Sequence, residues 1–416
     1  MRFHTVIVGG GLSGLVAGVT LARTGKRVAI VSSGQSSLHF NGGSLELLGA
    51  LPDGTAVQHP LEAAASLPEE HPYAKIGVSR LPQLAADAAK LLATVGMPMQ
   101  GDVSVNHYRL TPMGVAKPAW LTMGDYVTLE HPDVLPWNNV LLVNVAGFMD
   151  FPVNFVAHGL REMGATVRVE ELDVEPLAAR RASATEMRAA NLAKSLVSGS
   201  AVSRLASAIN EVAGDNDEVV LMPAVLGLDD DHAVTMLRAQ VSKPLHMVAT
   251  LPPAVPGARL HTTLRHYFQM LGGTYLMGDT VQRGTFEGNR LTGVHTAKLA
   301  DTVLQADNYV MAGGSFLSRG LMANYERVYE PVLDLDVTAP TDRAQWTRYG
   351  VFNQQPYMSF GVSVDRQFHA LKGGEPLDNV YAVGSILGGH DPVKMGDGTG
   401  VAMLTALAVA QQIIDN

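Results

Sequence analysis

Cysteine is absent from the 416 residues of the chain. The chain can therefore form no disulfide, offer no thiolate nucleophile and ligate no iron–sulfur cluster through its own thiolates. If the protein handles electrons, an organic cofactor or another chain must carry them.

Positive charge is also scarce. Thirty Lys and Arg residues stand against 39 Asp and Glu residues, which gives a formal net charge of −9 at pH 7, and no basic run occurs. Because nucleic-acid binding depends on clustered cations that neutralise phosphates, nucleic acid is not expected as a main partner. The apolar content of 47% and the length fit a soluble globular protein with two domains.

The first residues, MRFHTVIVGG, lack the succession of charged, apolar and small residues that marks a signal peptide. We therefore expect a cytoplasmic protein. The uncharged stretch over 5–22 is long enough for a membrane span, but its five glycines and its initial strand pattern favour a different structure. Any membrane association is expected to come through a partner or a peripheral surface.

A glycine-rich turn near the N-terminus carries the first functional signal. The pattern predicts a strand over 5–8, a helix over 12–24 and a strand over 27–31. Between the first two elements, Gly9, Gly11 and Gly14 match the G-x-G-x-x-G motif of dinucleotide-binding domains. In that motif the glycines allow a tight turn, close approach of a pyrophosphate and close helix–strand packing. The sequence thus predicts an α/β fold with a parallel sheet; a structural turn without ligand is the alternative.

The residues after the second strand depart from the motif. An acid is expected about 20 residues past the turn, where it binds the adenosine ribose. Positions 28–36 read VAIVSSGQS, so Ser32 and Ser33 stand in its place. A neutral hydroxyl binds a ribose more weakly than a carboxylate does. The missing acid makes a shorter flavin without adenosine possible; the alternative is a decayed site that serves only architecture.

The next loop, SSLHFNGGSLELLG, offers further cofactor contacts. Gly42 and Gly43 can bring backbone amides close to a phosphate or a flavin ring, and His39 is placed to contact the cofactor or a substrate. The alternative is a loop followed by a helix that Ser44 caps.

Two later segments repeat the strand–glycine pattern. A buried strand over 310–312 leads into Gly313 and Gly314, and a strand over 380–383 ends at Gly384 and Ser385. The sequence GDGTG then introduces a last helix, whose N-terminus can stabilise negative charge on a reduced flavin. The cofactor contacts predicted in this part are Gly313, Gly384, Ser385, Gly398, Thr399 and Gly400. Ser385 occupies a place where aspartate commonly holds the ribityl chain.

Catalytic candidates are few. His390 and Asp391 can form an acid–base pair beside a flavin, although a capped turn before Pro392 explains them equally. An anionic substrate could be bound by His107, Arg109 or Arg188, although such residues more often form surface or interdomain pairs. The acidic stretch DDDH over 229–232 indicates a solvated turn, and no metal site is expected.

The repeated pattern predicts a discontinuous, Rossmann-like FAD/NAD(P)-binding flavoprotein fold with an inserted second domain. The cofactor domain is expected over 1–50, 254–330 and 375–416. The inserted cap or partner domain is expected over 51–253 and 331–374.

Several longer stretches together resemble one family. They are MRFHTVIVGGGLSGL, GQSSLHFNGGSLELLGALPDG, ATEMRAANLA, LPPAVPGARL, GGTYLMGD and NVYAVGSILGGHDP. In order and spacing, from residue 1 to about residue 413, the chain resembles the B subunit of anaerobic glycerol-3-phosphate dehydrogenase.

The resemblance implies one subunit of a three-part enzyme that oxidises sn-glycerol 3-phosphate to dihydroxyacetone phosphate. Electrons pass toward the quinone pool, with fumarate or nitrate as terminal acceptor. The A subunit would hold FAD and the dehydrogenase site, and the C subunit would hold iron–sulfur clusters and attach the complex to the inner membrane. The B subunit, to which this chain corresponds, would bind FMN.

Three alternatives stay open at this point. A complete G-x-G-x-x-G cradle suits a pyrophosphate, which FAD has and FMN lacks. The chain could also be a self-sufficient FAD-dependent oxidoreductase of a small substrate. Finally, it could be a non-catalytic scaffold of the complex.

Overall fold

The protein is described by a computed structural model over residues 1–175, 177–183, 185–299 and 301–416. Ala184, the first residue of the stretch ATEMRAANLA, lies outside the described residues.

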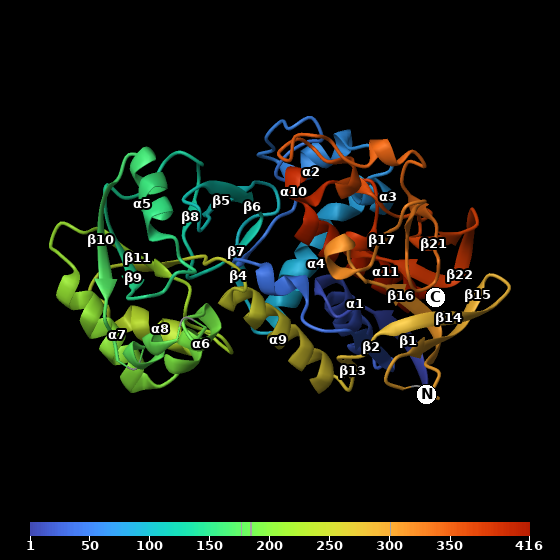
Figure 1. Cartoon of the computed structure of the whole chain (residues 1–416), viewed down its shortest axis with the longest axis horizontal. Coiled ribbons are helices and arrows are strands. Elements are labelled where there is room, and N and C mark those ends of the chain that lie inside the picture. The colour runs from blue at the N-terminus through green and yellow to red at the C-terminus, as the bar shows by residue number, and fades with distance from the viewer. Residues whose placement is uncertain (176, 184, 300) are drawn as a thin grey trace.

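A six-stranded sheet forms the centre of the larger part of the molecule, with the strand order β13-β2-β1-β16-β22-β21 (Figure 1). Its strands are β1 (Arg2–Val8), β2 (Val28–Ser32), β13 (Thr274–Met277), β16 (Gln305–Met311), β21 (His369–Lys372) and β22 (Glu375–Ala382). Five of them pair in parallel, and β21 runs antiparallel to β22. The sheet therefore joins segments from the start, the later middle and the end of the chain, as the predicted discontinuous α/β fold requires.

Three helices cover this sheet and each other: α1 (Leu12–Ala22), α9 (Val255–Met270) and α11 (Gly398–Asp415). Helix α1 packs against both α9 and α11. It lies close to β2, because a Cβ added at Gly18 would meet Ile30 Cδ1 at 2.7 Å. An apolar helix with glycine on its sheet-facing side can pack this closely, and α1 is buried along almost its whole length.

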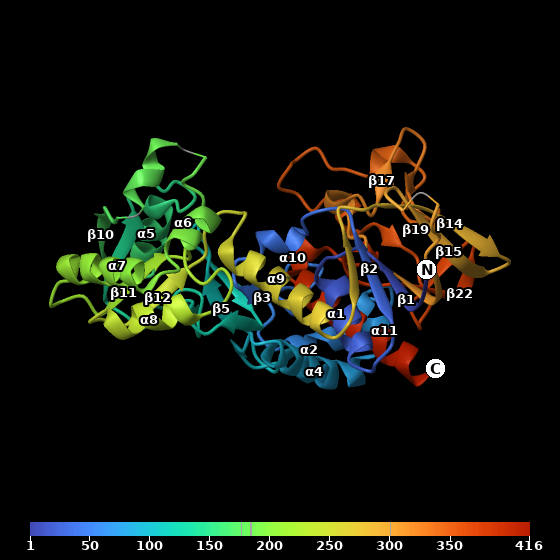
Figure 2. The ribbon, with the colours of Figure 1, turned by 90° about the horizontal axis from the view of Figure 1, so that it is seen from below.

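A second parallel sheet lies in a separate region, to the left of the six-stranded sheet in both Figure 1 and Figure 2. Its order is β10-β9-β11-β12, formed by β9 (Asn139–Val145), β10 (Thr166–Leu172), β11 (Val219–Pro223) and β12 (Leu245–Val248). The helices of this region are α5 (Val153–Glu162), α6 (Ala189–Ser195), α7 (Gly199–Val212) and α8 (His232–Gln240). The sequence pattern does not predict a second parallel sheet in this region.

The remaining elements are small sheets and further helices. The two three-stranded sheets are β3 (Ser44–Leu45), β7 (Leu121–Met123) and β4 (Met99–Gln100), and β6 (Ala116–Ala119), β5 (His107–Leu110) and β8 (Thr128–Leu129). The helices are α2 (Pro60–Ala63), α3 (Pro72–Ile76), α4 (Leu81–Thr94) and α10 (Pro392–Met395). The antiparallel pairs are β14 (Val281–Glu287) with β15 (Arg290–Thr296), β17 (Met322–Ala323) with β18 (Val328–Tyr329), and β19 (Val337–Thr338) with β20 (Gly361–Val362).

Two details differ from the expected local structure. Ser44 begins no helix; it pairs with Thr122 in the sheet of β3 and β7. Helix α4 belongs to the stretch from residue 51 onward that the sequence assigns to the inserted domain. It packs against α11, beside the six-stranded sheet. Its apolar face of Leu84, Ala88 and Leu91 is buried, so packing partners rather than chain order decide where α4 lies.

Within the described residues, no helix combines the length and apolar character needed to cross a membrane.

Candidate functional site

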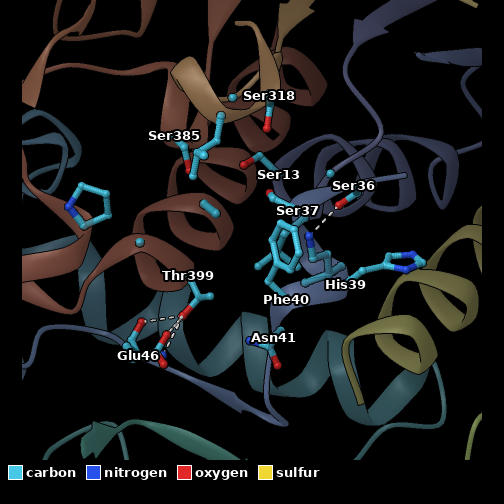
Figure 3. A pocket seen from close by; sticks show the side chains of 18 of the residues that line it. Ser13, Ser36, Ser37, His39, Phe40, Asn41, Glu46, Ser318, Ser385 and Thr399 are labelled. Carbon is cyan, nitrogen blue, oxygen red and sulfur yellow. Dashed lines mark hydrogen bonds between the residues drawn. The ribbon is translucent and has the colours of Figure 1, made fainter. Parts of the chain in front are cut away.

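A pocket of about 1110 Å³ lies at the carboxyl ends of the parallel strands. Gly9 follows β1, Ser32 ends β2 and Ala312 follows β16, and all three line it. In open α/β sheets this is the edge where ligands bind. Figure 3 shows polar side chains from several distant segments around the pocket.

Two glycines of the turn are required by close backbone contacts. Gly9 has a φ of +120°, and a Cβ there would lie 2.1 Å from the carbonyl oxygen of Ala312. A Cβ at Gly14 would lie 2.0 Å from the carbonyl oxygen of Gly9. Gly14 therefore holds α1 close to the turn without lining the pocket.

Gly11 has a different environment. It lines the pocket, and the nearest atom to an added Cβ is Ser36 Oγ at 3.7 Å. It also precedes α1, whose first amides have no partner within the helix. Leu12 and Ser13 of this first turn line the pocket as well. The open space and the amides at a helix N-terminus fit the phosphate of a cofactor.

The end of β2 contributes hydroxyls only. Ser32 is nearly buried, and its Oγ donates to the carbonyl oxygen of Gly34 at 3.1 Å. Ser33 is exposed and lines the same end of the pocket. Among the described residues that line the pocket, Glu46 is the single acidic one, and it comes from a different segment.

The loop after β2 places His39 and Gly42 on the pocket wall. His39 belongs to a 3-10 helix over Ser37–Phe40, and its ring centroid lies 5.1 Å from that of His261 on α9. Its Nε2 is buried and has no hydrogen-bond partner among the described residues. Burial, followed by the charge of Arg265, lowers the pKa of His39. Gly43 lies outside the pocket lining, next to the Tyr126 ring.

The N-terminus of α11 lies on another side of the pocket. Gly398 and Thr399 line it, whereas the Gly400 amide donates to the carbonyl oxygen of Glu46 at 2.8 Å. The Thr399 hydroxyl lies 3.0 Å from Glu46 Oε2, as Figure 3 shows. The first two residues of the helix thus line the pocket, while the amide of the third fixes the loop that carries Glu46.

Of the remaining predicted cofactor contacts, two line the pocket and one packs behind its wall. Gly313 and Ser385 line the pocket. Gly384 does not, and a Cβ there would lie 1.9 Å from Ser13 Oγ. Gly384 therefore allows close packing beneath the first turn of α1.

His390 and Asp391 do not pair with each other in the structure, and neither lines the pocket. Asp391 Oδ1 accepts hydrogen bonds from the amides of Val393 and Lys394 at 3.1 Å and so caps α10. His390 Nδ1 lies 3.0 Å from Oδ1 of Asp397. The capped turn that the sequence offered as an alternative is thus present, and a catalytic role for either residue stays a prediction.

A buried cluster of His71, His390 and Asp397 was not predicted from the sequence. His71 Nε2 donates to Asp397 Oδ2 at 2.9 Å, and both side chains are fully buried. Burial alone would raise the pKa of Asp397, but the charges and hydrogen bonds of His390 and His71 hold it well below its usual range. Burial lowers the pKa of His71 despite its bond to Asp397.

The three ligand atoms of this cluster lie within 4.8 Å of one another, a spacing that could hold a metal ion. All three already take part in hydrogen bonds within the cluster. The expectation that the chain has no metal site stays a prediction. His71 and Asp397 are 326 positions apart, so no local pattern pointed to them.

The candidates for anion binding separate in the structure. Arg109 lines the pocket. His107 Nε2 lies 2.7 Å from Thr122 Oγ1, and Arg188 pairs with Asp150 at 2.6 Å, both away from the pocket. The acidic stretch over 229–232 leads into α8, where Asp230 accepts from the His232 amide.

Comparisons with known proteins agree with this geometry. The model of the FAD binding domain family matches residues 4–401. The B subunit of anaerobic glycerol-3-phosphate dehydrogenase from Yersinia enterocolitica is 43% identical, covering 100% of this chain and 98% of that protein. The B subunits from Pectobacterium carotovorum and Actinobacillus succinogenes are 40% and 37% identical, each covering 100% of this chain and 99% of theirs.

The chain belongs to the B-subunit family of anaerobic glycerol-3-phosphate dehydrogenase. The predicted family is confirmed, and so is the predicted Rossmann-like flavoprotein fold. The chain is therefore an oxidoreductase with a flavin site. The family name also implies a complex of several subunits.

Proposed function

We propose that this chain is the flavoprotein B subunit of a glycerol-3-phosphate dehydrogenase complex and relays electrons within it. The A subunit removes hydride from glycerol 3-phosphate on its FAD, and the C subunit holds iron–sulfur clusters and attaches the cytoplasmic complex to the inner membrane. Electrons leave toward the quinone pool, with fumarate or nitrate as terminal acceptor. The observation that carries the flavin site is the open face of Gly11 beside the first turn of α1.

A bound flavin would supply hydride acceptance and stepwise electron release, which protein side chains cannot provide. The first-turn amides of α1 would hold its phosphate. Gly398 and Thr399 offer the positive end of α11 to negative charge on the cofactor. Because Glu46 fixes Thr399 and the Gly400 amide, this helix end is held in place before any ligand binds.

FMN is the flavin we propose first. The family resemblance supports it, and so does the absence of an acid among the described lining residues at the end of β2. Ser32 offers a neutral hydroxyl oxygen there, which accepts from a ribose more weakly than a carboxylate does.

FAD is the second candidate, on a separate observation. The pocket continues past the glycine turn to Ser33 and Gly34, where the adenosine half of a dinucleotide lies in this fold class.

The test is to purify the chain alone, release its cofactor by heat and identify the cofactor by chromatography and mass. FMN at one per chain supports the first proposal. FAD supports the second candidate and would mean that Ser32 or Ser33 binds the adenosine ribose in place of the usual acid. A colourless chain that still assembles with the A and C subunits would overturn the flavin proposal in favour of a scaffold.

The relay role has its own test, since flavin binding alone does not establish electron transfer. Glycerol 3-phosphate should bleach the flavin of this chain only when the A subunit is present. Bleaching by glycerol 3-phosphate in the isolated chain would contradict a pure relay and support a self-sufficient oxidoreductase.

A further inference from the structure

The lining of the flavin pocket is positively charged although the chain is acidic. Arg109, Lys117 and Lys394 line it, against one acid, Glu46, in a chain of net charge −9. A concave site lined mainly by one sign of charge concentrates ligands of the opposite sign. The excess charge therefore indicates an anionic ligand.

Two of these cations face each other directly. Arg109 on β5 and Lys117 on β6 are antiparallel partners in register, so their side chains share one face of the sheet. Like charges placed opposite each other on a sheet are destabilising. An anion bound between them would remove this repulsion.

The Arg109 guanidinium is only partly satisfied. Its Nη2 donates to Glu46 Oε1 at 3.1 Å. Its Nε is buried and has no partner among the described residues. A guanidinium has five N–H donors in a planar fork that suits phosphate and carboxylate oxygens. Part of this donor capacity therefore has no protein partner among the described residues.

The basic pair and the glycine turn lie at different ends of the pocket. Glu46 links Arg109 to Thr399 of α11. In Figure 3, Glu46 and Thr399 lie on the side opposite Ser36, which is the nearest neighbour of the open face of Gly11. A cofactor phosphate held by α1 would therefore lie at the other end of the pocket from Arg109.

We propose that Arg109 and Lys117 bind the anionic group of a small phosphate monoester, so that this chain has a substrate subsite of its own in the flavin pocket. Over the whole pocket lining, Arg109, Lys117 and Lys394 leave two positive charges after Glu46 is subtracted, and a phosphate monoester carries close to two negative charges at pH 7. The subsite rests on the proposed flavin function because both share one pocket. It goes beyond that function, since a pure relay needs no substrate anion beside its cofactor.

The experiment is calorimetric titration of the flavin-loaded chain with sn-glycerol 3-phosphate, inorganic phosphate and glycerol, at low ionic strength. The two phosphates should bind, and glycerol should not. Arg109→Gln and Lys117→Gln should each weaken phosphate binding on the order of tenfold, the worth of one charge-assisted hydrogen bond. Lys90→Gln, at an exposed position of α4 away from the pocket, is the matched control and should bind as the parent does.

Flavin content, measured on each variant, separates the two proposals. Flavin retained with phosphate binding lost in the variants supports the subsite. Flavin bound but no phosphate binding in the parent overturns the subsite and leaves the relay intact. Flavin lost from Arg109→Gln and Lys117→Gln means that these cations hold the cofactor phosphate, which also overturns the subsite. A parent chain that binds no flavin overturns the proposed function itself.

Discussion

At the scale of single residues, Gly11 shows how one missing side chain makes room for a ligand. Gly9 and Gly14 cannot carry a Cβ without meeting backbone atoms at about 2 Å, so replacing them disturbs the fold itself. A Cβ at Gly11 instead enters the open pocket. Gly11 is thus the position where loss of cofactor and loss of fold can be separated.

We predict that Gly11→Val folds with nearly the parent thermal stability in the absence of flavin but retains less than about a tenth of the flavin, because the valine occupies the phosphate position beside the first turn of α1. Flavin released from the purified protein gives the content, and thermal unfolding after removal of flavin gives the stability. Gly124→Val is the control, because within the described residues nothing lies within 4 Å of an added Cβ there and Gly124 is outside the pocket. Normal flavin content in Gly11→Val would show that the cradle is assigned to the wrong residues.

A second residue-scale prediction concerns acid stability. His261 on α9 is buried, and its Nε2 lies 3.4 Å from the Tyr275 hydroxyl. Burial, with the charges of His39 and Arg265, lowers the pKa of His261 to about 4 from the usual 6.5. Between pH 6.5 and 4, His261 therefore binds a proton in the unfolded chain but stays neutral in the folded chain. The contribution of neutral His261 to the free energy of unfolding is complete above pH 6.5. It falls by about 3 kcal/mol as the pH drops to 4.

Urea unfolding at a series of pH values tests this dependence. His261→Gln should flatten the fall in the free energy of unfolding between pH 6.5 and 4 relative to the parent. His266→Gln changes an exposed histidine on the same helix, so its profile should run parallel to that of the parent. Identical slopes for His261→Gln and the parent would mean that another group causes the acid sensitivity.

At the scale of elements, the buried cluster of His71, His390 and Asp397 joins three segments. His71 precedes α3, His390 precedes α10, and Asp397 precedes α11. The two histidines form hydrogen bonds with a carboxylate whose side chain is fully buried. Through Asp397 they fix the start of α11, whose next two residues line the pocket.

We predict that His390→Ala lowers the free energy of unfolding by about 2–3 kcal/mol, because a buried carboxylate loses a hydrogen-bond donor. Urea unfolding measures this loss, and flavin content should stay close to the parent value because His390 does not line the pocket. His131→Ala, at an exposed position, is the control. If His390→Ala instead keeps its stability and its flavin but abolishes turnover of the complex, the role in catalysis that the sequence suggested would be supported.

The sequence predicted those elements whose pattern is local. The strand, glycine turn and α1 follow one another within the first 22 residues, so spacing alone identifies them. The contact of His71 with Asp397 joins residues 326 positions apart and leaves no local trace. Ser44 matched a helix cap in isolation, yet pairing with Thr122 made it part of a strand. That Arg109 and Lys117 lie opposite each other likewise depends on the register of β5 and β6.

At the scale of the whole molecule, the flavin pocket and the four-stranded sheet are formed by different parts of the chain. No described residue between 119 and 252 lines the flavin pocket. The four-stranded sheet lies within that stretch and is formed by one continuous part of the chain, over 139–248. We propose that this region is the part of the inserted domain that folds as a unit of its own, in keeping with the division predicted from the sequence.

Hydrogen exchange with and without flavin tests this proposal. A ligand that binds only the folded form stabilises the unit that holds its site, by about 2.7 kcal/mol at a free concentration of one hundred times its dissociation constant. Amides of β1, β16 and α11 that exchange only when their unit unfolds should therefore slow about a hundredfold. Amides of β9 and β11, equally buried but outside that unit, should exchange at an unchanged rate. Equal slowing in both sheets would show that the chain unfolds as one unit, and flavin would then stabilise the second sheet without touching it.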